Sequence, residues 1–397
     1  MHMLTNPWLH YAWGSVDLLP ALLHMRSDSR PVAEIWMGAH PALPSSIEVD
    51  GQEVDLDDYV EHHAQQALGT GIVNRSGAQL PYMIKLLAAG QPLSLKVHPT
   101  RKQAEKGYDR EDAAGIPLTD PTRNYRDRSH KPEMLYALTP FEMMCGFRRV
   151  EVIWDLLAGL GVAELAPFIE SLDRADPSEA LRLTLTALLT GDTRQQQVLT
   201  RAVVASASER STHRPEYRLV QDLSEHFPND IGIVASLFLN HLRIDPGESV
   251  FIGAGLIHSH IRGLGLELTV TSDNALRAGL TSKHVDVPEL LDLVRFTSLT
   301  PALVPAAHLG DASIFLPPVA DFALWTYTPA SDADGTLVTL HGPSAGARIA
   351  VCCAGHCTLT CHGERLVLTP GQSAFIFDVD GPMEISTTGT VAVAYVP

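Results

Sequence analysis

Polar and apolar side chains alternate in the segment Ser94-Leu95-Lys96-Val97-His98. In an extended strand Ser94, Lys96 and His98 point to one face, while Leu95 and Val97 point to the other. A lone histidine is more often a structural residue than a metal ligand. Three polar residues with a period of two raise the odds of chemistry on that face, because buried polar groups need partners.

A carboxylate and a second histidine could join His98. Glu133 lies in the run 130–133, where Pro132 favours an extended residue before it. An ordinary surface ion pair between Lys131 and Glu133 is the alternative interpretation. His98, Glu133 and His258 together form a set of two histidines and one carboxylate. Such a set suits a catalytic zinc with an open position, or a non-haem iron.

Cysteines offer a rival metal site near the end of the chain. Four of them, with His356 and His362, lie in a short segment: Cys352, Cys353, Cys357 and Cys361. Their spacing lacks the paired Cys-x-x-Cys halves of a zinc ribbon, and it coincides with a β-strand pattern. Cysteine often behaves as a small buried hydrophobe, so we interpret the cluster as core. With Cys145 the total is five, which favours reduced thiols in a cytoplasmic protein.

The composition fits a folded protein of two to three domains. The chain has 397 residues, of which 45% are hydrophobic and 19% charged. Its formal net charge of −17 disfavours nucleic-acid and anionic-membrane partners, since both need a basic face. The first residues lack a charged segment followed by an apolar run, and no apolar stretch is long enough for a spanning helix. We therefore expect no signal peptide and no membrane partner.

The elements that must position these residues fall into regions of different periodicity. Residues 1–149 have short β-like runs with Gly and Pro breaks, as expected for the first part of a catalytic domain. Residues 150–232 have helical spacing, and Asp176-Pro177-Ser178 predicts a helix start. Residues 233–320 return to a β pattern and would complete the catalytic domain, because they carry His258. We interpret residues 321–397 as a separate, structural β-barrel.

An internal repeat supports two related barrels. The sequence PGESVFI at 246–252 recurs as PGQSAFI at 370–376, and each copy follows a short apolar strand. Strand, Pro-Gly turn and strand repeated in this way are typical of double-sheet jelly rolls. The first copy is soon followed by His258, whereas no histidine follows the second within the same distance. A metal held in a barrel would therefore lie in the first one.

The motifs along the chain resemble those of type I phosphomannose isomerases. The likeness covers most of the chain and is carried by seven segments: 11–15, 33–41, 92–99, 124–127, 130–133, 137–141 and 272–281 with Ser272-Asp273-Asn274 and Arg277–Thr281. The resemblance implies a mainly β fold with two cupin-type jelly-roll barrels and a helical insertion. It also implies a zinc enzyme with one ion per chain, acting on a sugar phosphate as a monomer or a small homo-oligomer.

The resemblance assigns roles to individual residues. His98, Glu133 and His258 match the zinc ligands of the family. Arg277, Lys131 and Glu267 match its active-site charged residues, and His130 adjoins Lys131 as in bacterial members. Lys85 and Ser94 match positions lining the same pocket.

Two positions depart from the family pattern. Lys96 stands where the family usually has a glutamine that is the fourth zinc ligand, and His260 stands where it usually has a tyrosine. Either zinc keeps three protein ligands and water, which we favour, or Lys96 turns toward a carboxylate or the substrate phosphate. His260 could supply an acid–base group or a fourth ligand instead.

The implied reaction interconverts D-mannose 6-phosphate and D-fructose 6-phosphate through a cis-enediol. Zinc and Arg277 could stabilise the oxyanion, whereas Glu267, His260 and Lys131 all remain candidates for the base. Lys85, Arg277 and Lys96 are candidates for holding the phosphate. The alternatives are an isomerase of a different sugar, an iron(II) oxygenase that uses the same triad, and a non-catalytic sugar-phosphate sensor.

Overall fold

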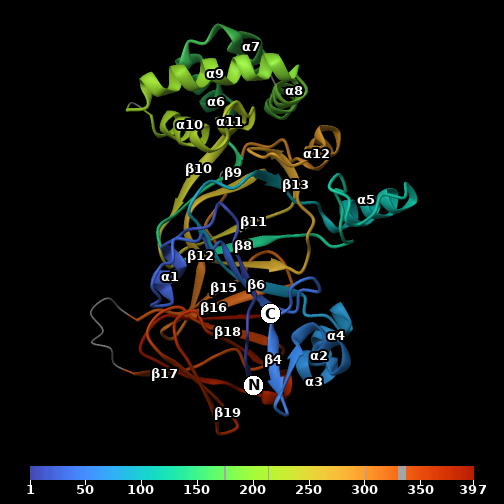
Figure 1. Ribbon diagram of the computed structural model, residues 1–397, viewed down its shortest axis with the longest axis vertical. Helices are drawn as coiled ribbons and strands as arrows, with labels where there is room; N and C mark the ends of the chain where they lie inside the picture. Colours follow the sequence, from blue (N-terminus) through green and yellow to red (C-terminus); the bar gives the residue numbers. More distant parts are fainter. Residues whose placement is uncertain (174–175, 213, 300, 330–336) are drawn as a thin grey trace.

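The computed structural model describes residues 1–173, 176–212, 214–299, 301–329 and 337–397. The molecule is elongated, with a group of helices at one end, strands in the middle, and a second group of strands at the other end (Figure 1). This arrangement confirms a mainly β fold with a helical insertion. The strands form curved, packed sheets, and neither β unit is a single closed barrel.

A ten-stranded antiparallel arrangement occupies the middle of the molecule and carries the candidate site residues. Its strands come from both sides of the helical insertion in the sequence. They are β2 (Trp8–Leu9), β3 (Glu34–Gly38), β6 (Tyr82–Ala89), β7 (Leu95–Val97), β8 (Glu133–Ala137), β9 (Phe141–Phe147), β10 (Leu239–Ile244), β11 (Ser249–Ile252), β12 (His258–Val270) and β13 (Leu276–Gly279).

The long strand β12 connects two groups of strands within this arrangement. Its first part pairs with β9 and β7, and its second part, from Gly263 onward, pairs with β6 and β8. Gly263 has φ +131°, and a Cβ there would lie 2.7 Å from the ring of Phe141. Only glycine permits this backbone conformation without strain. Both parts of β12 can therefore contribute side chains to one interior.

The second β unit contains a seven-stranded and a four-stranded sheet. The larger sheet consists of β1 (His2–Met3), β14 (Ala306–Leu309), β15 (Ala312–Phe315), β16 (Ala323–Tyr327), β18 (Arg348–Cys352), β21 (Ser373–Ile376) and β23 (Val391–Tyr395). The smaller one consists of β17 (Val338–His341), β19 (Cys357–Cys361), β20 (Glu364–Leu368) and β22 (Glu384–Thr387). Strand β1 pairs with β21, so the N-terminal segment joins the C-terminal unit.

The repeated sequence forms the same local structure in both units. The first copy links β10 to β11 and the second links β20 to β21. Gly247 and Gly371 occupy equivalent turn positions, with φ +91° and +82°. The cysteines of the second unit are all buried and free, and their β strands pack into its core. Among the described residues, no candidate metal-binding group includes a cysteine.

The helical segment packs on one end of the ten-stranded arrangement. It comprises α6 (Val150–Leu160), α7 (Ala166–Leu172), α8 (Pro177–Leu189), α9 (Thr193–Arg210), α10 (Pro215–His226) and α11 (Gly232–Ser236). Helix α8 begins as predicted, because the Asp176 side chain accepts a hydrogen bond from the backbone N–H of Ser178.

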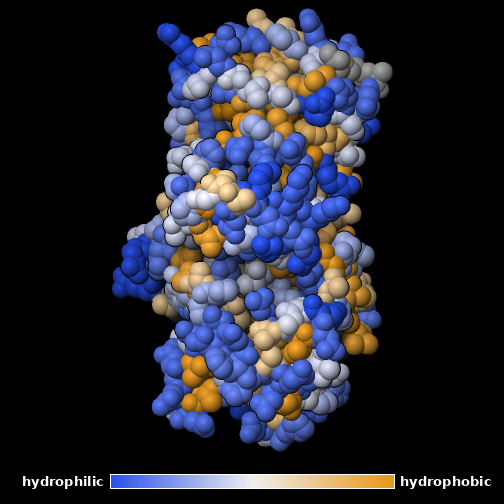
Figure 2. Space-filling view, turned by 90° about the vertical axis from the view of Figure 1, so that its right-hand side faces the viewer, coloured by the Kyte–Doolittle hydropathy of each residue, from blue (hydrophilic) through white to orange (hydrophobic). Residues whose placement is uncertain are grey.

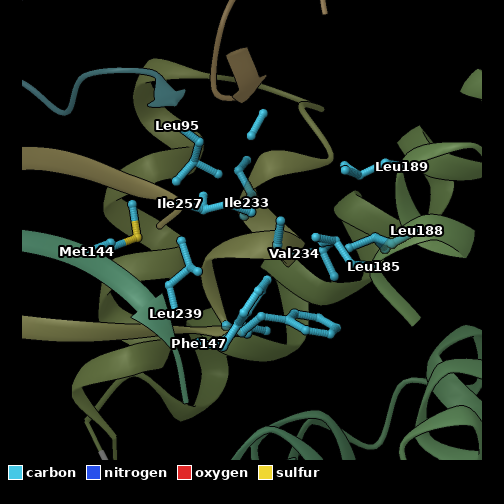
Figure 3. Packing of buried hydrophobic residues seen from close by; sticks show 14 of the residues in the cluster. Leu95, Met144, Phe147, Leu185, Leu188, Leu189, Ile233, Val234, Leu239 and Ile257 are labelled. Atoms are coloured by element: carbon cyan, nitrogen blue, oxygen red, sulfur yellow. The ribbon is translucent and has the colours of Figure 1, made fainter. Parts of the chain in front are cut away.

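One hydrophobic cluster joins these helices to the strands. Leu185 and Leu188 of α8 and Ile233 of α11 belong to the same buried cluster as Leu95 of β7 and Ile257 just before β12 (Figure 3). Burial of a large apolar side chain contributes about 1.5–3 kcal/mol. The same cluster therefore fixes the helices and steadies the backbone on both sides of Lys96 and His258.

The other α-helices lie outside this segment: α1 (Leu18–Leu22), α2 (Leu56–His62), α3 (Ala64–Leu68), α4 (Thr70–Ser76), α5 (Arg101–Ala113) and α12 (Val287–Leu293). A two-stranded hairpin of β4 (Ser46–Val49) and β5 (Gln52–Asp55) precedes α2. Figure 2 shows a face on which hydrophilic residues dominate and hydrophobic ones form smaller groups. Within the described part of the chain, no helix is both long and apolar enough to span a membrane.

Candidate metal and substrate site

His98, Glu133 and His258 lie together in the interior of the ten-stranded arrangement. His98 follows β7, Glu133 begins β8 and His258 begins β12, so three strands distant in sequence bring them together. All three side chains are buried, and one potential ligand atom from each lies within 4.8 Å of the others. The residues derived from sequence as a two-histidine, one-carboxylate set are therefore neighbours in space.

Backbone carbonyl groups fix the orientation of both imidazoles. His98 Nδ1 is 2.6 Å from the backbone oxygen of Asn274, and His258 Nδ1 is 2.9 Å from that of Leu256. A carbonyl oxygen only accepts, so each Nδ1 carries a proton, and in the neutral ring Nε2 then keeps its lone pair. The metal-ligating nitrogens of both rings are therefore free to coordinate.

The donor set fits a zinc ion. His98 Nε2 lies 3.0 Å from Glu133 Oε1, and His258 Nε2 lies 3.1 Å from Glu133 Oε2. Lone pairs that face a carboxylate repel it unless a cation lies among them. Burial lowers the pKa of His98 to about 3, so its imidazole is neutral at neutral pH, as coordination requires. Two neutral imidazoles and a carboxylate are typical of catalytic zinc.

Lys96 turns toward the carboxylate of this set. Its Nζ is 3.4 Å from Glu133 Oε1, and its side chain is only 12% exposed. Burial by itself would raise the pKa of Glu133, but Lys96 and His98 hold that pKa well below its usual value. Of the two orientations considered for Lys96, the structure therefore places the ammonium at a carboxylate.

Lys85, Glu34 and Glu267 form a second charged group in the same interior. Lys85 Nζ is 3.4 Å from Glu267 Oε2 and 3.5 Å from Glu34 Oε1, and it lies 4.8 Å from the ring centroid of Trp36. Burial would lower the pKa of Lys85, but Glu34 and Glu267 outweigh it and raise the pKa. Lys85 is therefore a charged lysine held between two buried carboxylates.

His260 and Glu267 face each other between the ligand set, through Glu133, and the Lys85 group. His260 Nδ1 is 3.8 Å from Glu267 Oε1, and neither ring nitrogen of His260 has a hydrogen bond within the described structure. Burial lowers the pKa of His260 to about 4, so the ring is neutral near pH 7. With Glu133 the two residues form a second group whose ligand atoms lie within 4.8 Å.

Arg277 and Ser94 lie on the less buried side of the site. Arg277 donates a hydrogen bond of 2.9 Å to the Ser94 hydroxyl, and its strand position is opposite Lys96. Among the described residues Arg277 has no ion pair with a carboxylate, so its guanidinium can receive an anion. Lys131 is buried, and burial followed by the charge of Lys85 lowers its pKa to about 8.

His130 contacts a carboxylate that belongs to neither of these groups. Its Nε2 is 3.2 Å from Asp321 Oδ2, and Asp321 lines a cleft of about 1100 Å³ that also contains Arg101. The cleft does not contain the ligand set. The family resemblance places His130 with Lys131 in the active site, and this role stays a prediction, because the structure shows the His130 ring at Asp321.

Sequence reasoning assigned no role to several residues that complete the site. Glu34 and Trp36 are two residues apart on β3, so they share one face, and both contact Lys85. Asn274 orients His98 through its backbone, and its buried side chain bonds to the backbone of Asp127 and Ser129. These residues lie in the motifs 33–41 and 272–281, so the motifs themselves were the available signal.

Known proteins are similar to this chain over most or all of its length. Residues 1–150 match the family model of the phosphomannose isomerase type I catalytic domain. The mannose-6-phosphate isomerase of Salmonella typhimurium is 38% identical over 401 residues, covering 100% of this chain and 99% of the relative. The mannose-6-phosphate isomerase of Homo sapiens is 30% identical over 365 residues and covers 84% of each chain.

Solved structures agree with these relatives. A mannose 6-phosphate isomerase bound with zinc and yttrium has a TM-score of 0.89 at 36% identity, covering 100% of this chain and 99% of that one. A histidine-to-alanine variant of phosphomannose isomerase from Salmonella typhimurium has a TM-score of 0.91 at 35% identity with the same coverage. With two full-length likenesses of this kind, the chain belongs to the type I phosphomannose (mannose-6-phosphate) isomerase family.

Proposed function

We propose that this chain is a zinc-dependent isomerase that interconverts D-mannose 6-phosphate and D-fructose 6-phosphate through a cis-enediol. The observation that carries the proposal is the buried set His98, Glu133 and His258, with both Nε2 lone pairs directed at the carboxylate. Relatives named mannose-6-phosphate isomerase at 37–38% identity over the whole chain support the substrate.

His98, Glu133 and His258 would hold the zinc ion. A bound zinc ion would supply Lewis acidity, which polarises the carbonyl of the open-chain sugar and stabilises negative charge on its oxygen. Asn274 and Leu256 keep the two imidazoles in the coordinating tautomer through their backbone oxygens. The two histidine ligands are therefore oriented for coordination before zinc binds.

Glu267 and His260 are the candidates for moving the proton between C2 and C1. Burial raises the pKa of Glu267, but the charges of Lys85 and Lys96 outweigh it, so the carboxylate is ionised. His260 is neutral because burial lowers its pKa to about 4. Lys131, with a pKa of about 8, is mostly protonated at pH 7 and suits proton donation or charge stabilisation instead.

Arg277 and Ser94 are the best candidates for holding the phosphate. Arg277 has no carboxylate partner among the described residues, and it already shares a hydrogen bond with the Ser94 hydroxyl. Lys85 is engaged by two carboxylates, which leaves it less available to a third anion. A guanidinium also binds a phosphate in two-pronged geometry, which orients the substrate.

A coupled assay tests the proposal. Mannose 6-phosphate is supplied and fructose 6-phosphate is followed, first with the purified protein, then after chelation, and finally with zinc added back. We expect turnover that disappears on chelation and returns with zinc. Folded, zinc-replete protein without turnover would contradict the proposal. Oxygen uptake with bound iron would then indicate an oxygenase, and binding without turnover would indicate a sensor.

A further inference from the structure

Lys96 introduces a positive charge at the carboxylate that a metal ion would share. Its Nζ is 3.4 Å from Glu133 Oε1, the same oxygen that lies 3.0 Å from His98 Nε2. Lys96 pairs with His258 on one neighbouring strand and with Arg277 on the other. Its backbone is therefore fixed beside the ligands, and the ammonium reaches Glu133 without rearrangement of the strands.

Glu133 needs a compensating charge whether or not a metal is bound. Its side chain is fully buried, and an ionised carboxylate without a partner is strongly unfavourable in that environment. Among the described residues, Lys96 is the lysine or arginine that forms an ion pair with Glu133. The nearby Lys85 is engaged with Glu34 and Glu267.

We propose that Lys96 is an internal counter-cation for Glu133 that competes with the metal. The protein then folds stably with its metal site empty, and zinc binds only by displacing the ammonium from the carboxylate. The inference rests on the proposed zinc function, but it concerns metal affinity and stability rather than turnover. An ammonium group left near a dication would repel it, so its presence weakens zinc binding.

Two neutral replacements separate this role from the loss of a ligand. Lys96→Gln removes the charge and adds an oxygen that could coordinate zinc, whereas Lys96→Leu removes the charge and adds no ligand. Lys102→Gln, at an exposed position on α5, is the matched control because it changes the net charge equally at a solvent-exposed position. Zinc affinity is measured by competition with a chelator, and thermal unfolding is measured with and without chelator.

We expect both Lys96 variants to bind zinc at least tenfold more tightly than the parent protein and the Lys102 variant. In chelator, both should unfold several degrees below the parent, because Glu133 loses its partner. Zinc should raise their unfolding temperature more than that of the parent, since stabilisation grows with affinity.

Three outcomes would overturn the inference. Equal zinc affinity and equal stability in chelator would show that Lys96 does not compete with zinc for Glu133. Tighter binding by Lys96→Gln alone would indicate a missing ligand rather than a competing charge. Weaker zinc binding by both variants would make Lys96 itself a ligand. Absence of zinc binding in every protein would instead reject the zinc function on which the inference rests.

Discussion

Lys85 and Glu267 lie directly opposite each other on β6 and β12, and Lys85 Nζ is 3.4 Å from Glu267 Oε2. The same ammonium is 3.5 Å from Glu34 Oε1 on β3. All three side chains are buried. One lysine thus pairs with two carboxylates contributed by the strands on either side of it, and this relationship links the stability of the sheet to the charge state of the site.

Replacing Lys85 should therefore destabilise the protein. Lys85→Met keeps the aliphatic stem but leaves Glu34 and Glu267 without their shared partner, at a cost of about 3–5 kcal/mol. The free energy of unfolding in urea measures this cost. Lys102→Met on the exposed face of α5 is the control and should change it by less than about 0.5 kcal/mol. A Lys85→Met protein as stable as the control would show that the pair contributes little.

Removing the guanidinium of Arg277 should impair turnover without unfolding the protein. Arg277→Ala is expected to lower kcat/KM for mannose 6-phosphate by about 10²-fold or more, because a charge-assisted contact to the substrate is lost. Arg277→Lys should recover part of the loss, since it restores charge but not the two-pronged geometry. Steady-state kinetics on protein with unchanged circular dichroism decide the matter. Turnover near that of the parent would show that Arg277 does not contribute to substrate binding or catalysis.

The buried histidines predict a loss of stability in acid. The pKa of His260 is lowered to about 4 and that of His98 to about 3, from an ordinary value of 6.5. The unfolded chain therefore takes up protons first as the pH falls. Stability from these groups is complete above about pH 6.5 and is lost progressively below it, down to about pH 4 for His260 and about pH 3 for His98.

His260→Phe tests the part of this effect that comes from His260. The ring of His260 packs edge-on against Phe141 at 5.4 Å, so phenylalanine fits the same space without the buried nitrogens. We expect the variant to lose roughly 3 kcal/mol less stability than the parent between pH 7 and pH 4. Unfolding of the metal-free proteins in urea at both pH values measures the difference. Parallel losses in the two proteins would contradict the prediction.

Asn274 should act on the metal through His98. Its backbone oxygen receives the His98 Nδ1 proton, and its buried side chain bonds to the backbone of Asp127 and Ser129. Asn274→Ala removes these side-chain bonds and frees the loop, so we expect a 10–100-fold weaker zinc affinity. Chelator competition measures the affinity, and Asn274→Asp should lose at least as much as the alanine variant, because it replaces the amide N–H donors of these bonds with an oxygen that faces two carbonyl groups. Unchanged affinity in Asn274→Ala would show that the loop holds its shape without these bonds.

Local sequence patterns predicted the elements well. The alternation at 94–98, the repeated Pro-Gly turn and the Asp176 cap each depend on a few neighbouring residues, and each forms the expected structure. The fold class followed from these patterns together with the change to helical periodicity at residue 150. In each case the physical cause is local: side-chain direction in a strand, turn geometry, or capping of a helix.

Contacts across the sheet could not be predicted in the same way. Glu133 reaches His98 and His258 only through the register of three separate strands, which no local pattern determines. The side chain of Lys96 contacts the buried carboxylate of Glu133, and that of His130 contacts the half-buried carboxylate of Asp321. The motif carrying Glu34 was visible in the sequence, but its role depends on Lys85 of β6, a strand that pairs with β3 although β4 and β5 lie between them in sequence.

Strand β12 carries His258, His260 and Glu267 on one continuous backbone, with the bend at Gly263 between the second and the third. Side chains on a strand alternate between its two faces. The number of residues between two positions of β12, rather than the residue type, therefore determines whether their side chains lie on the same face. Deleting or inserting one residue between Gly263 and Glu267 would turn the carboxylate away while leaving both histidines in place. Substitutions around the site can therefore be tolerated, but the length of β12 cannot change. An insertion or deletion in that part of β12 would remove the Glu267 carboxylate from the site completely.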